Sequence, residues 1–224
     1  ELAPDDGSQV PLNKISLDIE TYNPRCMPDA LKDACVMIGY ASDEEKGVYS
    51  FSKKFSRDFV KTLETEKQML ESFAQLLRVK KVDVVCTYNG DVFDLPYLQE
   101  RANALKADFR LGRDKSRIKS KKIGLRIVSR LGGRVHYDVF PVVSFLNFIG
   151  TIKVSNLTLD RVYHEVLGGK KLDVGKEGIW QIWDKGSTNE LDHLADYCLT
   201  DAVACLELTN NFMHLQTELA KYVG

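Results

Sequence analysis

The sequence predicts an α/β domain built on a mixed β-sheet, and two features of its pattern indicate this class. Short segments of strand length dominate the first fifty residues, and segments with helical spacing alternate with strands after them. Strands that come first and then alternate with helices are typical of a sheet with helices packed on it. A chain of 224 residues is long enough for one such domain with a substantial core.

Each element follows from its own pattern. Alternating or β-branched apolar runs predict strands at 14–20, 34–41, 47–51 and 82–87. Apolar residues spaced three and four apart predict helices at about 65–78, 140–149, 156–167 and 190–214. The last of these begins with Ser187 and Glu190 at the spacing of a capping box.

Glycine and proline mark the connections. A loop over residues 88–95 leads into a helix whose first turn holds Pro96, where proline is tolerated. Segments 123–129 and 134–139 flank Gly132-Gly133 and predict a β-hairpin. Residues 1–12 are expected to form a flexible leader, and residues 170–178 the most flexible internal connection.

Composition excludes several classes of protein. The chain is 44% hydrophobic and 28% charged, with a net charge of −1, so it is neither disordered nor fibrous. No apolar run approaches the roughly 18 residues that a membrane span needs, and no secretory signal is visible. The five cysteines are widely spaced and form no C-x-x-C pair, which favours buried thiols and a cytoplasmic location.

Asp18 and Glu20 are two positions apart on an expected strand, so both carboxylates leave the same face. Two such charges about 4 Å apart repel by about 4 kcal/mol at an effective dielectric constant near 20. A divalent cation relieves that repulsion, and oxygen ligands favour Mg²⁺ or Mn²⁺ over zinc. Taken alone, the pair is more simply explained as solvated carboxylates at a strand edge.

Two further positions could carry chemistry. Asp94 follows a strand at the entrance to a helix, where α/β sheets place functional groups and where an N-cap residue is an equal alternative. Tyr197 and Asp201 are four residues apart on the last helix and share a face, on which a phenol and a carboxylate could orient a metal-bound water. An amphipathic helix with an incidental Tyr and Asp on its rim is the simpler interpretation of that pair in isolation.

Three segments together resemble, in order, the three exonuclease motifs of family B DNA polymerases. They are residues 16–21 around Asp18 and Glu20, residues 87–94 ending at Asp94, and residues 197–202 with Tyr197 and Asp201. The intervening segments 36–41, 111–114 and 133–141 resemble the archaeal branch, so that the resemblance covers about residues 13–213. A tyrosine four residues before the last aspartate is similar to the tyrosine (DEDDy) subtype of ribonuclease-H-like 3′–5′ exonucleases.

The resemblance implies a fold, an activity and residue roles. The fold is a ribonuclease-H-like mixed sheet flanked by helices over residues 13–224, and the activity is proofreading 3′–5′ hydrolysis of DNA with two Mg²⁺ or Mn²⁺ ions. Asp18, Glu20 and Asp201 would hold one ion, Asp18 and Asp94 the other, and Tyr197 would orient the attacking water. Asn89 is expected to hydrogen-bond the terminal nucleotides and Phe93 to stack on them, although Phe93 could equally belong to the core.

One segment is strongly basic. Residues 110–134 contain ten basic residues and one acidic residue, a net charge of +9. A protruding basic hairpin or arm of this kind suits backbone tracking of single-stranded DNA or a frayed 3′ end, with Arg113, Lys115 and Arg117 as candidate contacts. A solvated, mobile loop is the alternative.

Other functions remain open from the residues. An RNA-preferring 3′–5′ exoribonuclease would use the same carboxylates, and a nucleic-acid-binding or polymerase-docking module with weak activity would share the fold. We find no counterpart of the polymerase palm motifs, so the chain itself is not expected to synthesise DNA. A polymerase domain or polymerase partner and a free-standing exonuclease are both compatible with the sequence, and a membrane partner is not expected.

Overall fold

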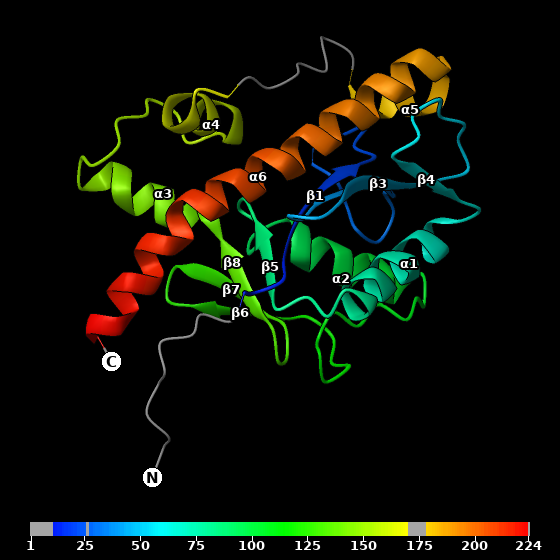
Figure 1. Ribbon diagram of the computed structural model, residues 1–224. Coiled ribbons are helices and arrows are strands. Elements are labelled where there is room, and N and C mark those ends of the chain that lie inside the picture. The colour runs from blue at the N-terminus through cyan, green and yellow to red at the C-terminus, as the bar shows by residue number, and fades with distance from the viewer. Residues whose placement is uncertain (1–10, 26, 170–177, 224) are drawn as a thin grey trace.

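The computed structural model describes residues 11–25, 27–169 and 178–223, which form a six-stranded mixed sheet with helices on both faces (Figure 1). The order across the sheet is β4-β3-β2-β1-β5-β8. β1 pairs antiparallel with β2 and β2 antiparallel with β3, whereas the pairs β1–β5, β5–β8 and β3–β4 are parallel. The strands of this sheet are β1 (Lys14–Thr21), β2 (Cys35–Ala41), β3 (Lys46–Phe51), β4 (Val60–Leu63), β5 (Val84–Thr87) and β8 (Val135–Asp138).

Helices cover the two faces of the sheet unequally. α1 and α2 pack on one face, and the long α6 crosses the other, with α3 and α4 beside one half of it and α5 beside the other (Figure 1). The helices are α1 (Glu66–Val79), α2 (Asp94–Ala104), α3 (Val139–Phe148), α4 (Leu159–Leu167), α5 (Ile179–Lys185) and α6 (Thr188–Val223). The mixed sheet flanked by helices confirms the predicted fold class.

The alternation of β1 decides which side chains reach which face. Ile15, Leu17 and Ile19 are buried in the core under α1 and α2. Ser16 faces the other way, because its hydroxyl donates to the backbone carbonyl of Ala202 in α6 at 2.6 Å. Asp18 and Glu20 have the same parity as Ser16, so their side chains lie on the α6 face of the sheet.

The predicted hairpin across Gly132-Gly133 is wrong in its pairing. The hairpin of the structure is β6 (Lys119–Ile123) with β7 (Arg126–Arg130), and it turns at Gly124 and Leu125. β8 instead pairs parallel with β5 in the main sheet. The Gly132-Gly133 turn leads from one sheet to the other, since a positive φ of 67° at Gly133 makes the chain change direction there.

Two short elements carry too little pattern to be predicted, namely β4 and α5. β4 has no fully buried residue, and α5 is only seven residues long. Most of the predicted leader (residues 1–12) falls on residues 1–10, and most of the predicted flexible connection (residues 170–178) on residues 170–177, so both lie largely outside the described residues. Residues 11–13 have no regular structure. Cys35, Cys86, Cys198 and Cys205 are free and buried. None of the helices in the described ranges is long and apolar enough to cross a membrane.

Candidate active site

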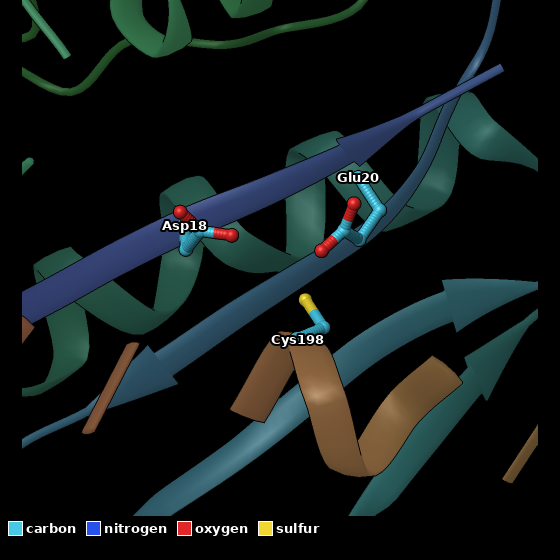
Figure 2. Close-up of side chains that lie close together, drawn as sticks. All are labelled: Asp18, Glu20 and Cys198. Atoms are coloured by element: carbon cyan, nitrogen blue, oxygen red, sulfur yellow. The ribbon is translucent and has the colours of Figure 1, made fainter. Parts of the chain in front are cut away.

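The centre of the site lies between β1 and α6. Asp18, Glu20 and Cys198 each offer a ligand atom, and these three atoms lie within 4.8 Å of one another. Figure 2 shows the two carboxylates on β1 above the thiol of α6. Glu20 is buried and Asp18 half-buried, so water shields their repulsion less than it would on an open surface.

Carboxylates, rather than the thiol, suit a metal ion here. Burial and the charges of Glu20 and Asp18 raise the pKa of the Cys198 thiol well above its usual value, and a protonated thiol is a poor metal ligand. Carboxylate oxygens are the ligands that Mg²⁺ and Mn²⁺ prefer. The donor set of the described site therefore fits the divalent cation that the sequence predicts.

Tyr197 and Asp201 complete this cluster from α6. The pKa of the Tyr197 phenol is raised by burial first, then by the charges of Asp201, Glu20 and Asp18, and by a hydrogen bond with Asp201. Those causes place the phenol beside three carboxylates that come from two elements far apart in the sequence, β1 and α6. Asp201 is itself buried, one turn along α6. The structure thus brings together four of the five residues that were expected to be catalytic.

Asp94 lies beside β1 at the start of α2. It is the first residue of α2, after the N-cap residue Phe93, and it is 5% exposed. Burial raises the pKa of Asp94 to about 7, and the nearby charge of Asp138 adds to this, while a hydrogen bond from the Ile19 backbone opposes it. The bond to Ile19, which lies between Asp18 and Glu20, fixes Asp94 against the strand that carries the acidic pair.

The loop before Asp94 is folded tightly. Asn89 has a positive φ of 66°, and its N–H donates to Asp138 Oδ1 at 2.7 Å. The Cα of Gly90 lies so close to the Thr87 side chain that any Cβ would clash. Phe93 is half-buried, packs against the core and lies 5.5 Å from the Tyr97 ring between centroids. A stacking role for Phe93 stays a prediction beside this core contact.

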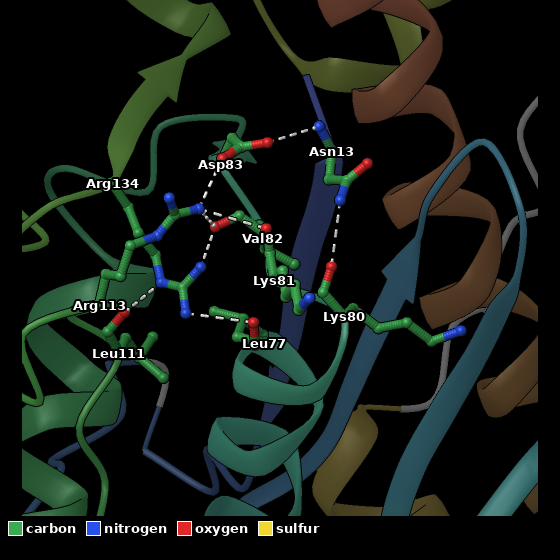
Figure 3. Close-up of polar contacts among 9 residues, drawn as sticks. All are labelled: Asn13, Leu77, Lys80, Lys81, Val82, Asp83, Leu111, Arg113 and Arg134. Atoms are coloured by element: carbon green, nitrogen blue, oxygen red, sulfur yellow. Dashed lines mark hydrogen bonds and ion pairs between the residues drawn. The ribbon is translucent and has the colours of Figure 1, made fainter. Parts of the chain in front are cut away.

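The three basic residues that were expected to contact substrate lie near the base of the arm. The Arg113 guanidinium donates to Asp83 Oδ1 at 2.5 Å and to the carbonyls of Lys81 and Val82 (Figure 3). Arg117 donates to Asn103 at 2.9 Å, and Lys115 is exposed with a φ of 63°. Arg113 therefore has a structural task at the base of the arm, and substrate contact stays a prediction for all three.

Arg134 closes the base of the same arm. Its guanidinium donates to the carbonyls of Leu111, Leu77 and Val82, as Figure 3 shows. The N–H of Arg113 also bonds to the carbonyl of Gly132 at 2.6 Å. Both ends of the basic segment are therefore hydrogen-bonded to the main domain, and the basic hairpin projects from there.

The sequence did not single out three residues near the site. Cys198 fills the space between Glu20 and β2. Asp138 holds the loop before Asp94 by accepting from the N–H groups of Asn89 and Asp91, and the Asp91 carboxylate binds β7. Asp138 ends a strand and caps the following helix by accepting from the N–H of Phe140 at 3.2 Å. Its place at a strand end, like that of Asp94, was the available signal.

Together these features define an α/β domain with an acidic site on the central strand of its mixed sheet. A family model described as "DNA polymerase family B, exonuclease domain" matches residues 2–162. The chain belongs to the exonuclease domain family of family B DNA polymerases.

Relatives named DNA polymerase resemble the whole chain. The identity is 37% over 225 residues with the Thermococcus aggregans protein and 33% over 223 residues with DNA polymerase 1 of Pyrococcus abyssi. The chain spans 12% of the length of the first and 28% of the second. The solved family B DNA polymerase of Pyrobaculum calidifontis superimposes with a TM-score of 0.77 over 93% of this chain and 25% of that one, at 24% identity, which supports the fold.

Proposed function

We propose that the chain is a metal-dependent 3′–5′ exonuclease that releases nucleotides from DNA 3′ ends. The observation that carries this proposal is the convergence of Asp18 and Glu20 from β1 with Tyr197 and Asp201 from α6. Membership of a family described as an exonuclease domain supports the same activity. Removal of misincorporated nucleotides beside a polymerase domain is the physiological role that the named relatives favour.

Each residue of the site has a part in the proposed reaction. Asp18, Glu20 and Asp201 would hold one cation, and Asp18 with Asp94 a second. Two such ions, when bound, supply an activated water and stabilise the leaving 3′-oxygen. The Tyr197 hydroxyl would orient the attacking water in line with the scissile phosphate, and the phenol is protonated near neutral pH, as tyrosine ordinarily is.

The exposed hairpin would hold the backbone of the strand being degraded. Residues that pair across the two strands share a face of the β6–β7 ribbon. By this rule one face carries four basic side chains, those of Lys119, Lys121, Arg126 and Arg130. All four are exposed. Each phosphate contact should lower the slope of log affinity against log salt by about 0.7 on a single strand. Replacing the four by alanine should flatten that slope, whereas Arg161→Ala on α4 should not.

Hydrolysis tests the proposal. Single-stranded DNA and DNA with a mismatched 3′ end should be digested in Mg²⁺ or Mn²⁺ and left intact in EDTA. Asp18→Ala should lose the activity, because it removes a ligand proposed for both ions, and Asp160→Ala, an exposed acid on α4, should keep it. Digestion by Asp18→Ala at the wild-type rate would refute the metal assignment. An RNA oligonucleotide in parallel decides between deoxyribonuclease and ribonuclease.

A further inference from the structure

Asp91 connects two parts of the molecule that the proposed reaction needs in one place. Its Oδ1 atom accepts a hydrogen bond of 2.6 Å from the backbone N–H of Ser129 in β7. The Ser129 hydroxyl donates in turn to the backbone carbonyl of Asp91 at 3.3 Å. One residue pair thus joins the loop that precedes Asp94 to the basic hairpin.

The loop end of this connection is held firmly. Asp138 accepts from the N–H of Asn89 at 2.7 Å through Oδ1 and from the N–H of Asp91 at 3.0 Å through Oδ2. The N–H groups of Val92 and Phe93 both bond to the carbonyl of Asn89. Because Asp138 fixes the backbone of Asp91, the Asp91 carboxylate is held in a defined position from which it can bind the hairpin.

At the hairpin end, the contact falls on the most buried residue of the two strands. Ser129 is 2% exposed, whereas every residue of β6 is exposed and Val128 is only half-buried. The Ser120 hydroxyl lies 2.8 Å from that of Ser129, so both strands are linked to the contact. His136 Nδ1 lies 3.3 Å from both Asp91 Oδ1 and the carbonyl of Ser129, and its side chain is 5% exposed.

The turn of the hairpin is not packed on the body in the same way. A cavity of about 450 Å³ separates it from the loop and from the start of α3. Leu125 at the turn is fully exposed, and Ile127 is exposed as well. The direction of the ribbon therefore depends on the polar contact at Ser129 more than on apolar packing at its tip.

The direction of the β6–β7 ribbon determines where its basic side chains point. Ser129 and Ser120 are cross-strand partners on the face toward the loop. Lys119, Arg130 and Arg126 have the opposite parity, so their side chains lie on the other face of the ribbon, and Arg126 also borders the cavity at the turn. Fixing Ser129 consequently fixes the orientation of the basic face relative to Asp94.

We propose that Asp91 is a positioning residue, which holds the basic hairpin at a set place relative to the acidic site. Its carboxylate makes the backbone of a bound strand meet the hairpin in register with the phosphate at the site. This inference rests on the proposed exonuclease function and adds to it a residue that touches neither the metal ions nor the scissile phosphate.

Steady-state kinetics on two substrates test the inference. Asp91→Ala should raise KM for a long single-stranded oligonucleotide about tenfold, the equivalent of one hydrogen bond to a charged group, with kcat nearly unchanged. A dinucleotide has no phosphate besides the scissile one for the hairpin to bind, so its hydrolysis should not change. Asp91→Asn keeps an oxygen that accepts from Ser129 and should recover most of the KM. The matched control is Asp160→Ala, which should behave as wild type. An equal loss on both substrates would overturn the inference.

A second measurement tests whether Asp91 affects KM through the basic residues of the hairpin. In a chain whose Lys119, Lys121, Arg126 and Arg130 are all alanine, Asp91→Ala should change KM by less than about twofold, because its effect is already lost. The same tenfold loss in that background would contradict a positioning role.

Binding separates this inference from the proposed function. A wild-type chain that digests neither substrate in Mg²⁺ would contradict the exonuclease proposal alone. The anisotropy of a labelled oligo-dT in Ca²⁺ still decides about Asp91. Weaker binding by Asp91→Ala of about tenfold supports the positioning role, and unchanged affinity refutes it.

Discussion

Asp94 has an unusual environment for an acidic residue. It is nearly inaccessible to water, and Asp138 adds a second negative charge nearby. Both effects favour the protonated carboxyl group, so its pKa rises to about 7. A cation bound beside it would compensate the charge and allow ionisation. Metal binding and proton release are therefore linked at this residue.

The stability of the metal-free chain should report this linkage. Below about pH 4 the group is protonated in both the folded and the unfolded chain. Between about pH 4 and pH 7 the unfolded chain ionises freely while the folded chain keeps the proton, so stability from this group is lost as pH rises. Asp94→Asn should remove that loss.

Chemical denaturation in EDTA at several pH values measures how the Asp94 carboxyl group changes the free energy of unfolding with pH. The free energy of unfolding of Asp94→Asn should improve relative to wild type from pH 4 to pH 7. Asp160→Asn, at an exposed position, should show no such trend. A pH-independent difference between Asp94→Asn and wild type would show that the carboxyl is not perturbed.

Among the elements, α6 contributes most to the site, and its close approach to β2 sets its position. A Cβ on Gly39 would lie 2.5 Å from the carbonyl oxygen of Cys198 and 2.9 Å from its Sγ. Glycine is needed there because no larger residue leaves room for the helix backbone. Tyr197 and Asp201 flank Cys198 on the same helix, so the distance between β2 and α6 also sets their distance from Glu20.

Gly39→Ala should push α6 away from the sheet. We expect the free energy of unfolding to fall by about 1–3 kcal/mol, the usual effect of overpacking. Stabilisation by Mg²⁺ should shrink as well, because the ligands on α6 move away from those on β1. Thermal unfolding with and without Mg²⁺ measures both effects. Gly150→Ala is the control, since its Cβ meets nothing within 4 Å and only the positive φ opposes it.

The elements also show what the sequence could predict. Alternation in β1 and the four-residue spacing in α6 were enough to place Asp18 with Glu20 and Tyr197 with Asp201, because both patterns are local. The pairing of β8 with β5 was missed, since register across a long connection leaves no local pattern. Cys198 and Asp91 were missed for a related reason: their roles depend on contacts with β1 and β7 that only the fold creates.

At the scale of the whole molecule, one buried ion pair joins three elements behind the sheet. Arg101 of α2 donates to both oxygens of Glu66 of α1 at 2.7 Å, and Glu66 also accepts from the N–H of Cys35 in β2 at 2.8 Å. Arg101 further donates to the carbonyl of Ala30. Removing one partner would leave a buried charge without compensation.

Arg101→Ala should therefore lower the free energy of unfolding by about 3–5 kcal/mol. Lys32→Ala, which breaks the exposed pair with Asp29, should lower it by less than about 1 kcal/mol. Denaturant titration compares the two variants. Because neither residue lies at the acidic site, the hydrolysis rate per folded molecule should stay at the wild-type value in both. Similar losses of stability would contradict the assigned burial.

Charge is also divided across the whole molecule. The net charge of −1 conceals a basic excursion of +9 over residues 110–134 and an acidic remainder. The acidic site lies between β1 and α6, and the exposed cations lie on the β6–β7 ribbon. A chain that is nearly neutral overall can therefore hold metal ions in one place and a phosphate backbone in another.

Digestion in Mg²⁺ of one DNA oligonucleotide, labelled at its 5′ end or at its 3′ end, tests the 3′–5′ exonuclease activity most directly. A 3′–5′ exonuclease should release the 3′ label at once as a mononucleotide and leave a 5′-labelled ladder that shortens one nucleotide at a time. Asp18→Ala should produce neither. Early release of the 5′ label, internal cleavage, or an unchanged ladder with Asp18→Ala would contradict the proposed activity.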